Sequence, residues 1–269
     1  MRAQGWKRPR LWRVTIFVLA FLFFLGPIAA SVRFSLIQLN GKDGLGNYTK
    51  IFHDATLGSS LTTSLEIAGI TTGIMLVLML PTVVWVRLKL HKLTLWVESV
   101  SVLPIVITPI VMGAGLASLQ QHSGSALKSL LFNSPITALT PFYVILALPF
   151  AYRSLDVGVR AIDLRTLVDA ARNLGASWPR LITRVVLPNI RTAVLTAASL
   201  TIALVLAEVV ISGVLLYPTY PVELVNQSQN DTGLAVSLSM LSLAITWLFL
   251  LLISYLGNRG ARGRVGRLI

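Results

Sequence analysis

The sequence predicts an all-α membrane protein with six transmembrane helices. Apolar residues make up 55% of the 269-residue chain and charged residues only 12%, with a mean hydropathy of +0.77. Soluble domains carry roughly 25% charged residues. The apolar residues lie in long runs, and most positive charges lie between alternate runs. This combination is expected of a multi-pass membrane protein.

Six apolar runs are long enough to cross the hydrocarbon layer, which takes about 20 helical residues. They are residues 14–36, 57–86, 95–119, 136–152, 192–216 and 234–256. The fourth run is short, and its two prolines predict kinks. The basic N-terminus also fits a signal peptide, but an uncleaved first span agrees better with the arginine-rich C-terminal tail. We expect one transmembrane domain over residues 1–269.

The positive charges predict that both termini lie in the cytoplasm, because short cytoplasmic segments are enriched in lysine and arginine. Of the 23 such residues, 19 fall in the terminal segments and in the second and fourth connections. They are Arg2, Lys7, Arg8, Arg10, Arg13, Arg87, Lys89, Lys92, Arg153, Arg160, Arg165, Arg172, Arg180, Arg184, Arg191, Arg259, Arg262, Arg264 and Arg267. The net charge of +13 therefore marks one membrane face and gives no reason to expect nucleic acid as a partner.

The fourth connection, about residues 153–191, is the only loop on this face long enough to form its own structure. An apolar face with helical spacing precedes Gly175 and consists of Leu164, Leu167, Val168, Ala171 and Leu174. Gly175 stands where a helix C-terminus favours a left-handed residue. The first part of the connection is therefore predicted to be a short helix that ends at this glycine.

A second helix is predicted to start near Ser177, a residue type that caps helix N-termini. Its apolar face consists of Leu181, Ile182, Val185 and Val186. Pro188 is expected to end or kink this helix at Leu187. The connection should thus contain two helices that meet at an angle.

Two interpretations of the first helix remain open. Ala170 and Ala171 leave little side-chain bulk, so another protein surface can approach the backbone closely and receive the helix in a groove. Alternatively, the helix lies on anionic lipid headgroups and is held there by its arginines.

The connection resembles the EAA loop of binding-protein-dependent ABC importer permeases. That family's pattern is E-A-A, three residues, G, nine residues, I, any residue, and L-P. The matching positions here are Asp169, Ala170, Ala171, Gly175, Val185, Leu187 and Pro188, with aspartate in place of glutamate and valine in place of isoleucine. Six spans, with this loop between the fourth and fifth, agree with the family over nearly the whole chain.

The resemblance implies a fold like that of type I ABC importers, in a bacterial cytoplasmic (inner) membrane. It also implies that the short helix couples the spans to a separate cytoplasmic ATPase dimer. Further partners would be a second, non-identical permease subunit, an extracytoplasmic substrate-binding protein and membrane lipid. The chain lacks the G-x-x-x-x-G-K-[ST] phosphate-binding pattern. We therefore expect no catalytic residues and no bound cofactor in this chain, with ATP and magnesium on the partner ATPase.

Three carboxylates fall within or at the ends of the predicted spans: Glu66, Glu98 and Glu208. Ionisable groups inside a membrane are costly and are functional candidates for that reason. Glu98 is predicted to lie at headgroup level or in an ion pair. Glu66 and Glu208 either line the path of a cation or hydrogen-bond a neighbouring helix.

The region around Glu208 resembles the fifth span of spermidine/putrescine-type permeases, which implies a small cationic substrate such as a polyamine. Related permeases for iron(III), thiamine or aminophosphonates share much of this pattern and remain alternatives.

Other functional classes fit less well. His53, His91 and His122 lie in separate loops and form no H-E-x-x-H metalloprotease motif, so no metal site is expected. An ATP-independent secondary transporter or channel fits the hydropathy alone but has no need of a docking helix.

Overall fold

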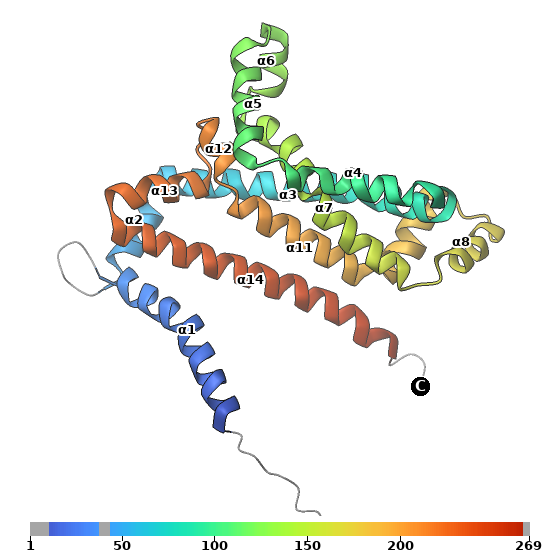
Figure 1. Ribbon diagram of the computed structural model, residues 1–269, viewed down its shortest axis with the longest axis horizontal. Coiled ribbons are helices and arrows are strands. Elements are labelled where there is room, and N and C mark those ends of the chain that lie inside the picture. Colours follow the sequence, from blue (N-terminus) through green and yellow to red (C-terminus); the bar gives the residue numbers. More distant parts are fainter. Residues whose placement is uncertain (1–10, 38–43, 266–269) are drawn as a thin grey trace, which may run out of the picture. The chain divides into compact units, whose positions relative to one another are not determined.

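The computed structural model of the protein describes residues 11–37 and 44–265, with the backbone alone at residues 11, 13, 91, 253, 254 and 256–265. Its regular elements are all helices (Figure 1). Five of the 19 residues predicted on the cytoplasmic face lie outside the described residues: Arg2, Lys7, Arg8, Arg10 and Arg267. So does Lys42, which is predicted to lie on the opposite face.

Five helical stretches in the described residues are long and apolar enough to cross a membrane, and a bent helix pair brings the number to six if it counts as one span. The helices that contain them are α1 (Leu11–Ser35), α3 (Ala55–Lys89), α4 (Thr94–Val106) with α5 (Pro109–His122), α7 (Pro135–Arg160), α11 (Arg191–Ala207) with α12 (Val210–Val214), and α14 (Thr232–Val265). The chain is therefore a multi-pass membrane protein, as the sequence predicted.

The shorter helices lie between these stretches. They are α2 (Gly46–His53), η1 (His91–Leu93), α6 (Ser125–Leu131), α8 (Leu164–Asn173), α9 (Trp178–Leu181), η2 (Ile182–Val186), α10 (Leu187–Asn189) and α13 (Tyr220–Asn230). Of these shorter helices, α2 lies in the first connection, α8 in the fourth and α13 in the fifth.

The third predicted span, residues 95–119, is a bent pair of helices, and it forms the sixth span if the pair counts as one. The helices α4 and α5 meet at an angle of 83° (Figure 1). Thr108 at the junction is extended, with ψ 141°, and Pro109 begins α5. Proline disfavours a helical conformation in the residue before it and has no N–H to continue the hydrogen-bond ladder.

The fourth span is longer than predicted. Helix α7 begins at Pro135 behind a capping box formed by Ser134 and Thr137, and it continues to Arg160 instead of ending at Tyr152. Hydropathy missed the last two turns because they carry charged residues. Leu155 and Val159 nevertheless remain buried there, so packing keeps this part of the helix in place.

The chain divides into two compact units, residues 55–223 with 245–269, and residues 1–54 with 224–244. In the larger unit α3, α7 and α11 pack against one another. One core cluster includes Val84 of α3, Leu155 of α7 and Val168 of α8, and a second includes Ile67, Tyr143 and Ile211.

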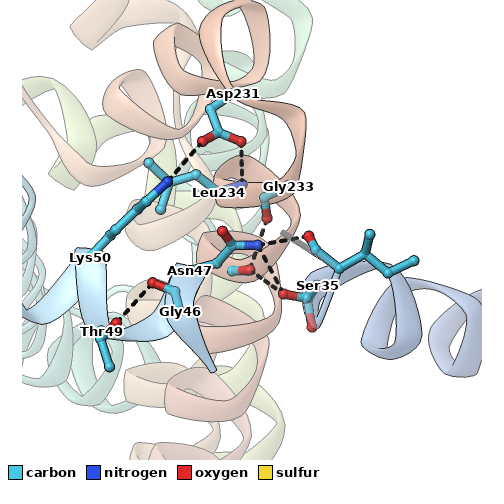
Figure 2. A network of polar contacts seen from close by, with 10 residues as sticks. Ser35, Gly46, Asn47, Thr49, Lys50, Asp231, Gly233 and Leu234 are labelled. Carbon is cyan, nitrogen blue, oxygen red and sulfur yellow. Dashed lines mark hydrogen bonds and ion pairs between the residues drawn. The ribbon is translucent and has the colours of Figure 1, made fainter. Parts of the chain in front are cut away.

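In the smaller unit, polar contacts tie the end of α1 to α2 and to the start of α14 (Figure 2). The Asn47 Nδ2 donates to the carbonyl oxygens of Ser35 and Ile37, at 3.2 and 3.1 Å. The Ser237 Oγ also donates to the Ser35 carbonyl, at 2.9 Å. A Cβ at Gly233 would approach the Asn47 Nδ2 to 3.2 Å, so this glycine gives the asparagine its room.

Candidate functional sites

Helix α8 carries the first three positions of the EAA-like pattern. It buries Leu164, Val168 and Ala171, which confirms most of the predicted apolar face. Leu174 was assigned to the same face, but its side chain is 89% exposed. The helix ends at Asn173. Beyond that residue the chain turns away, so the helical spacing no longer decides which side Leu174 faces.

Asp163 caps the N-terminus of α8. Its Oδ1 accepts a hydrogen bond from the Thr166 backbone N–H, at 3.4 Å. Hydrogen bonds from Thr166 stabilise the charged carboxylate and lower the pKa of Asp163 from its ordinary value. A negative charge here also interacts favourably with the helix dipole.

Gly175 ends α8 in a left-handed conformation, with φ +77°, as the sequence predicted. The Ala176 N–H donates to the Ala171 carbonyl at 3.0 Å, and the Gly175 N–H donates to the Arg172 carbonyl at 2.9 Å. These two bonds form a Schellman motif, which satisfies carbonyl groups left over at the helix end. The direction of the chain after α8 is therefore set by backbone geometry that favours glycine.

The second helix begins after Ser177, as expected, and Pro179 lies in its first turn. Leu181 and Val186 are fully buried, which confirms the core of its predicted apolar face. Pro188 was expected to end or kink this helix at Leu187, and the helix ends two residues later, at Asn189. The preceding turn widens into a π-helix, in which the Leu187 N–H donates to the Ile182 carbonyl. A π-turn is one way for a helix to accommodate a missing N–H.

The elbow, defined here as residues 164–189, has one exposed face and one buried face. Asp169 and Ala170 are exposed, Ala171 is buried, and Val185, Leu187 and Pro188 are half-buried. Ala170 on α8 and Leu174, directly after its end, are both exposed. The exposed surface of the elbow therefore contains a small residue and a leucine, with charged residues beside them.

Trp178 connects the elbow to the end of α3. Its ring lies 5.9 Å from the Lys89 Nζ and 5.4 Å from the Arg172 guanidinium carbon, so it forms two cation–π contacts. It also lines a cavity of about 250 Å³ with Pro81, Trp85, Lys89 and Ile182. Trp178 could not be found from the sequence, because nothing in the local pattern connects it with α3.

A buried ion pair joins the ends of α3 and α7, and it too was missed. The Arg87 Nε donates to the Asp156 Oδ1 at 2.6 Å, and the Arg160 Nε lies 2.7 Å from the Asp156 Oδ2. Only 8% of the Asp156 side chain is exposed. Asp156 and Arg160 are four residues apart, a spacing at which opposite charges pair on a helix. The sequence indicates this pair only if the fourth span is known to remain helical past Tyr152.

Glu208 lies at a break in the fifth span, between α11 and α12. Its carboxylate is buried and accepts three hydrogen bonds. The Oε1 accepts from the backbone N–H groups of Val210 and Ile211, at 2.7 and 2.9 Å, and the Oε2 accepts from the Tyr143 hydroxyl at 2.7 Å. The side chain thus satisfies two N–H groups that start α12 and ties the break to α7.

The other two carboxylates occupy different surroundings. Glu66 on α3 is exposed and makes no hydrogen bond or ion pair with the residues that the structure describes. Glu98 on α4 is half-buried, and no ion pair with Lys92 is present among the described residues. Of these three carboxylates, Glu208 is the one that accepts several hydrogen bonds from the described residues.

Within the part of the chain that the structure describes, no group of three or more histidine, aspartate or glutamate side chains is arranged to hold a metal ion. No protein-family model matches the sequence, and no curated protein matches it.

Proposed function

We propose that the protein is the membrane-spanning permease subunit of an ATP-driven importer, and that α8 is its coupling helix. The observation that carries this proposal is the EAA-like pattern on the elbow between α7 and α11. Asp169 and Ala170 offer a free surface, and Gly175 fixes the angle to the next helix.

The attachment of the elbow supports transmission of movement. Leu164 and Val168 share a core cluster with Val84 of α3 and Leu155 of α7. Trp178 contacts the end of α3 through Lys89. A force applied to the exposed face of α8 would therefore reach two candidate spans through close-packed side chains.

A separate ATPase dimer in the cytoplasm would supply the energy in this proposal, since the chain has no phosphate-binding loop. The proposal further includes a second, non-identical permease subunit and an extracytoplasmic binding protein that delivers the substrate. It also places both termini and the elbow in the cytoplasm of a bacterial cell, as the charge distribution favours.

A photo-crosslinking experiment tests the partner directly. The sequence contains no cysteine, so Asp169→Cys creates a unique thiol to which a benzophenone maleimide can be attached. In the assembled complex we expect this probe to label an ATP-hydrolysing subunit. Gln229→Cys, an exposed position in α13, is the matched control and should not label that subunit. Labelling of lipid alone from position 169 would favour an amphipathic helix on the membrane surface and contradict the proposal.

A second measurement tests coupling. Asp169→Lys reverses a charge on the exposed face of α8 without touching the buried one. We expect substrate-stimulated ATP hydrolysis by the complex to fall sharply while the complex still assembles. Unchanged stimulation would remove the coupling role of α8.

The substrate part of the proposal is a small cation such as a polyamine, with Glu208 and Glu66 on the pathway. A carboxylate within a span favours a cation. Because the Glu208 carboxylate already accepts three hydrogen bonds, its contribution to a cation site would come from its charge and its remaining lone pairs.

Glu208→Gln separates the two roles of this residue. The amide oxygen can still accept the two N–H bonds at the start of α12, but the negative charge is lost. If Glu208 attracts the substrate, uptake of a polyamine falls while the thermal midpoint changes little. Normal uptake would assign the carboxylate to the helix break alone, and binding assays with iron(III), thiamine and phosphonates on the cognate binding protein would then identify the substrate class.

A further inference from the structure

A polar cavity lies where α3 and α7 end and α8 begins. Its volume is about 320 Å³, and it is lined by Arg87 of α3, by Val159 and Arg160 of α7, and by the start of α8 with Ile162, Asp163, Leu164 and Arg165. Three of these seven residues are arginines. A cavity of this size has room for a phosphate group together with ordered water.

The charges around the cavity leave an excess of positive charge. Arg87 and Arg160 both pair with Asp156, and Asp163 caps α8. Arg165 makes no hydrogen bond or ion pair with the residues that the structure describes. Three arginines thus face two carboxylates, both of which already have partners within the chain.

The free N–H groups of these arginines suit an oxyanion such as a phosphate group. The Asp156 carboxylate engages the Nε and Nη2 atoms of Arg87, and the Nε of Arg160. The remaining guanidinium groups of Arg160, with half of its side chain exposed, and of Arg165 can therefore donate to another anion. Arginine presents its donors in a planar fork that matches phosphate oxygens.

The position of the cavity points to a membrane lipid as the source of that phosphate. Arg87 lies in the last turn of α3 and Arg160 is the last residue of α7, and both helices are candidate membrane spans. Side chains at the ends of spans lie at the depth of the lipid headgroups. Basic pockets between spanning helices recognise anionic headgroups in this way.

We propose that this cavity binds the headgroup phosphate of an anionic membrane lipid. The phosphate bridges the ends of α3 and α7 to the first turn of α8 through Arg160 and Arg165. The bound lipid would hold the start of α8 against the two spans. The inference needs only that α3 and α7 cross the membrane, so it goes beyond the proposed function and does not depend on an ATPase partner.

Native mass spectrometry of the full-length protein in detergent tests the site. Phosphatidylglycerol and phosphatidylcholine are added separately, and the fraction of protein that retains each lipid is measured. We expect Arg165→Gln to weaken retention of phosphatidylglycerol by about fivefold, since one arginine near an anionic headgroup contributes about 1 kcal/mol. Arg165→Lys should recover part of the loss, because the charge returns without the planar fork.

Arg184→Gln is the matched control, since Arg184 is exposed on the same elbow, carries the same charge and does not line the cavity. It should leave retention unchanged. Equal weakening by the two glutamine variants would indicate diffuse attraction to anionic lipid and overturn the proposal. A wild-type protein that retains both lipids equally would also overturn it.

A further arm distinguishes the lipid from free phosphate. Inorganic phosphate is added in place of lipid, and then in competition with phosphatidylglycerol. We expect little binding of inorganic phosphate and little displacement of the lipid. Tight binding of inorganic phosphate that displaces the lipid would assign the cavity to a soluble anion and contradict the lipid proposal. The thermal midpoint of Arg165→Gln, which should match that of the wild type, excludes misfolding as the cause of a lost lipid.

Discussion

The chain interrupts its helices at Gly175 and at Glu208 in two different ways. At Gly175 the break is exposed, and the backbone itself satisfies the helix end through a Schellman motif. At Glu208 the break is buried within a candidate span, and a side chain satisfies the start of the next helix with help from Tyr143 of α7. Where water is present, local backbone geometry is sufficient. Within a membrane, each freed N–H needs a partner from the protein.

The largest expected effect is that of Glu208→Ala. This change leaves two N–H groups of α12 and the Tyr143 hydroxyl without their acceptor in a buried site. We expect a loss of roughly 3 kcal/mol in the free energy of unfolding, since each buried unsatisfied group costs about 1–3 kcal/mol. Thermal unfolding in detergent measures it. A loss no larger than that of Glu208→Gln would show that the break does not depend on an acceptor at this position.

The next effect is that of Gly175→Val. A β-branched residue at φ +77° is strained by roughly 1–2 kcal/mol, although nothing lies within 4 Å of its Cβ position. Gly175→Asn is the matched control, because asparagine tolerates the left-handed region. Hydrogen exchange of the α8 amides should rise in the valine variant and stay near the wild-type rate in the asparagine variant. Equal rates in both would mean that the left-handed conformation is not required.

Tyr143→Phe tests the hydrogen bond from α7 at the break between α11 and α12. It removes one donor from the Glu208 carboxylate and leaves the two backbone bonds to Oε1 in place. We expect a loss of about 1 kcal/mol in the free energy of unfolding, since one buried hydrogen bond is removed. Thr201→Val, which removes a buried hydroxyl that bonds only within α11, is a suitable control of similar burial. A loss as large as that of Glu208→Ala would mean that the break is stabilised by the hydrogen bond from Tyr143 and not by the two N–H bonds at the start of α12.

The smallest effect concerns the start of α8. The folded protein lowers the pKa of Asp163, so its capping contribution is present above the ordinary carboxyl pKa and is lost as the pH falls through the lowered value. The α8 amides should therefore exchange faster as the pH falls below about 4, after correction for the intrinsic exchange rate. Asp163→Asn keeps a capping oxygen and should remove this pH dependence. A dependence that persists in that variant would have to come from another group.

The sequence predicted the elbow well because its signals are local. The spacing of Leu164 and Val168 fixes the buried face of α8, and a glycine at the helix end fixes the turn. Leu174 was assigned wrongly because periodicity does not show where a helix stops. Near Pro188 the helix ends at Asn189, two residues later than predicted, and a π-turn precedes the proline.

The break at Glu208 could not be predicted from the sequence. No glycine or proline stands at the junction of α11 and α12, and the run 192–216 reads as one apolar stretch. The carboxylate was recognised as a candidate because charge in a span is costly. Its partner Tyr143 lies 65 residues away, so no local pattern connects the two.

By itself, the sequence determined that this protein crosses a membrane several times and that its fourth connection turns at Gly175. Hydropathy and glycine conformation act within a few residues, and a single chain reveals them directly. Only the tertiary structure decided that Arg87 and Asp156 join the ends of α3 and α7, that Trp178 contacts the end of α3, and that Glu208 caps a broken span. These contacts join residues far apart in the chain, and their geometry depends on how the helices pack.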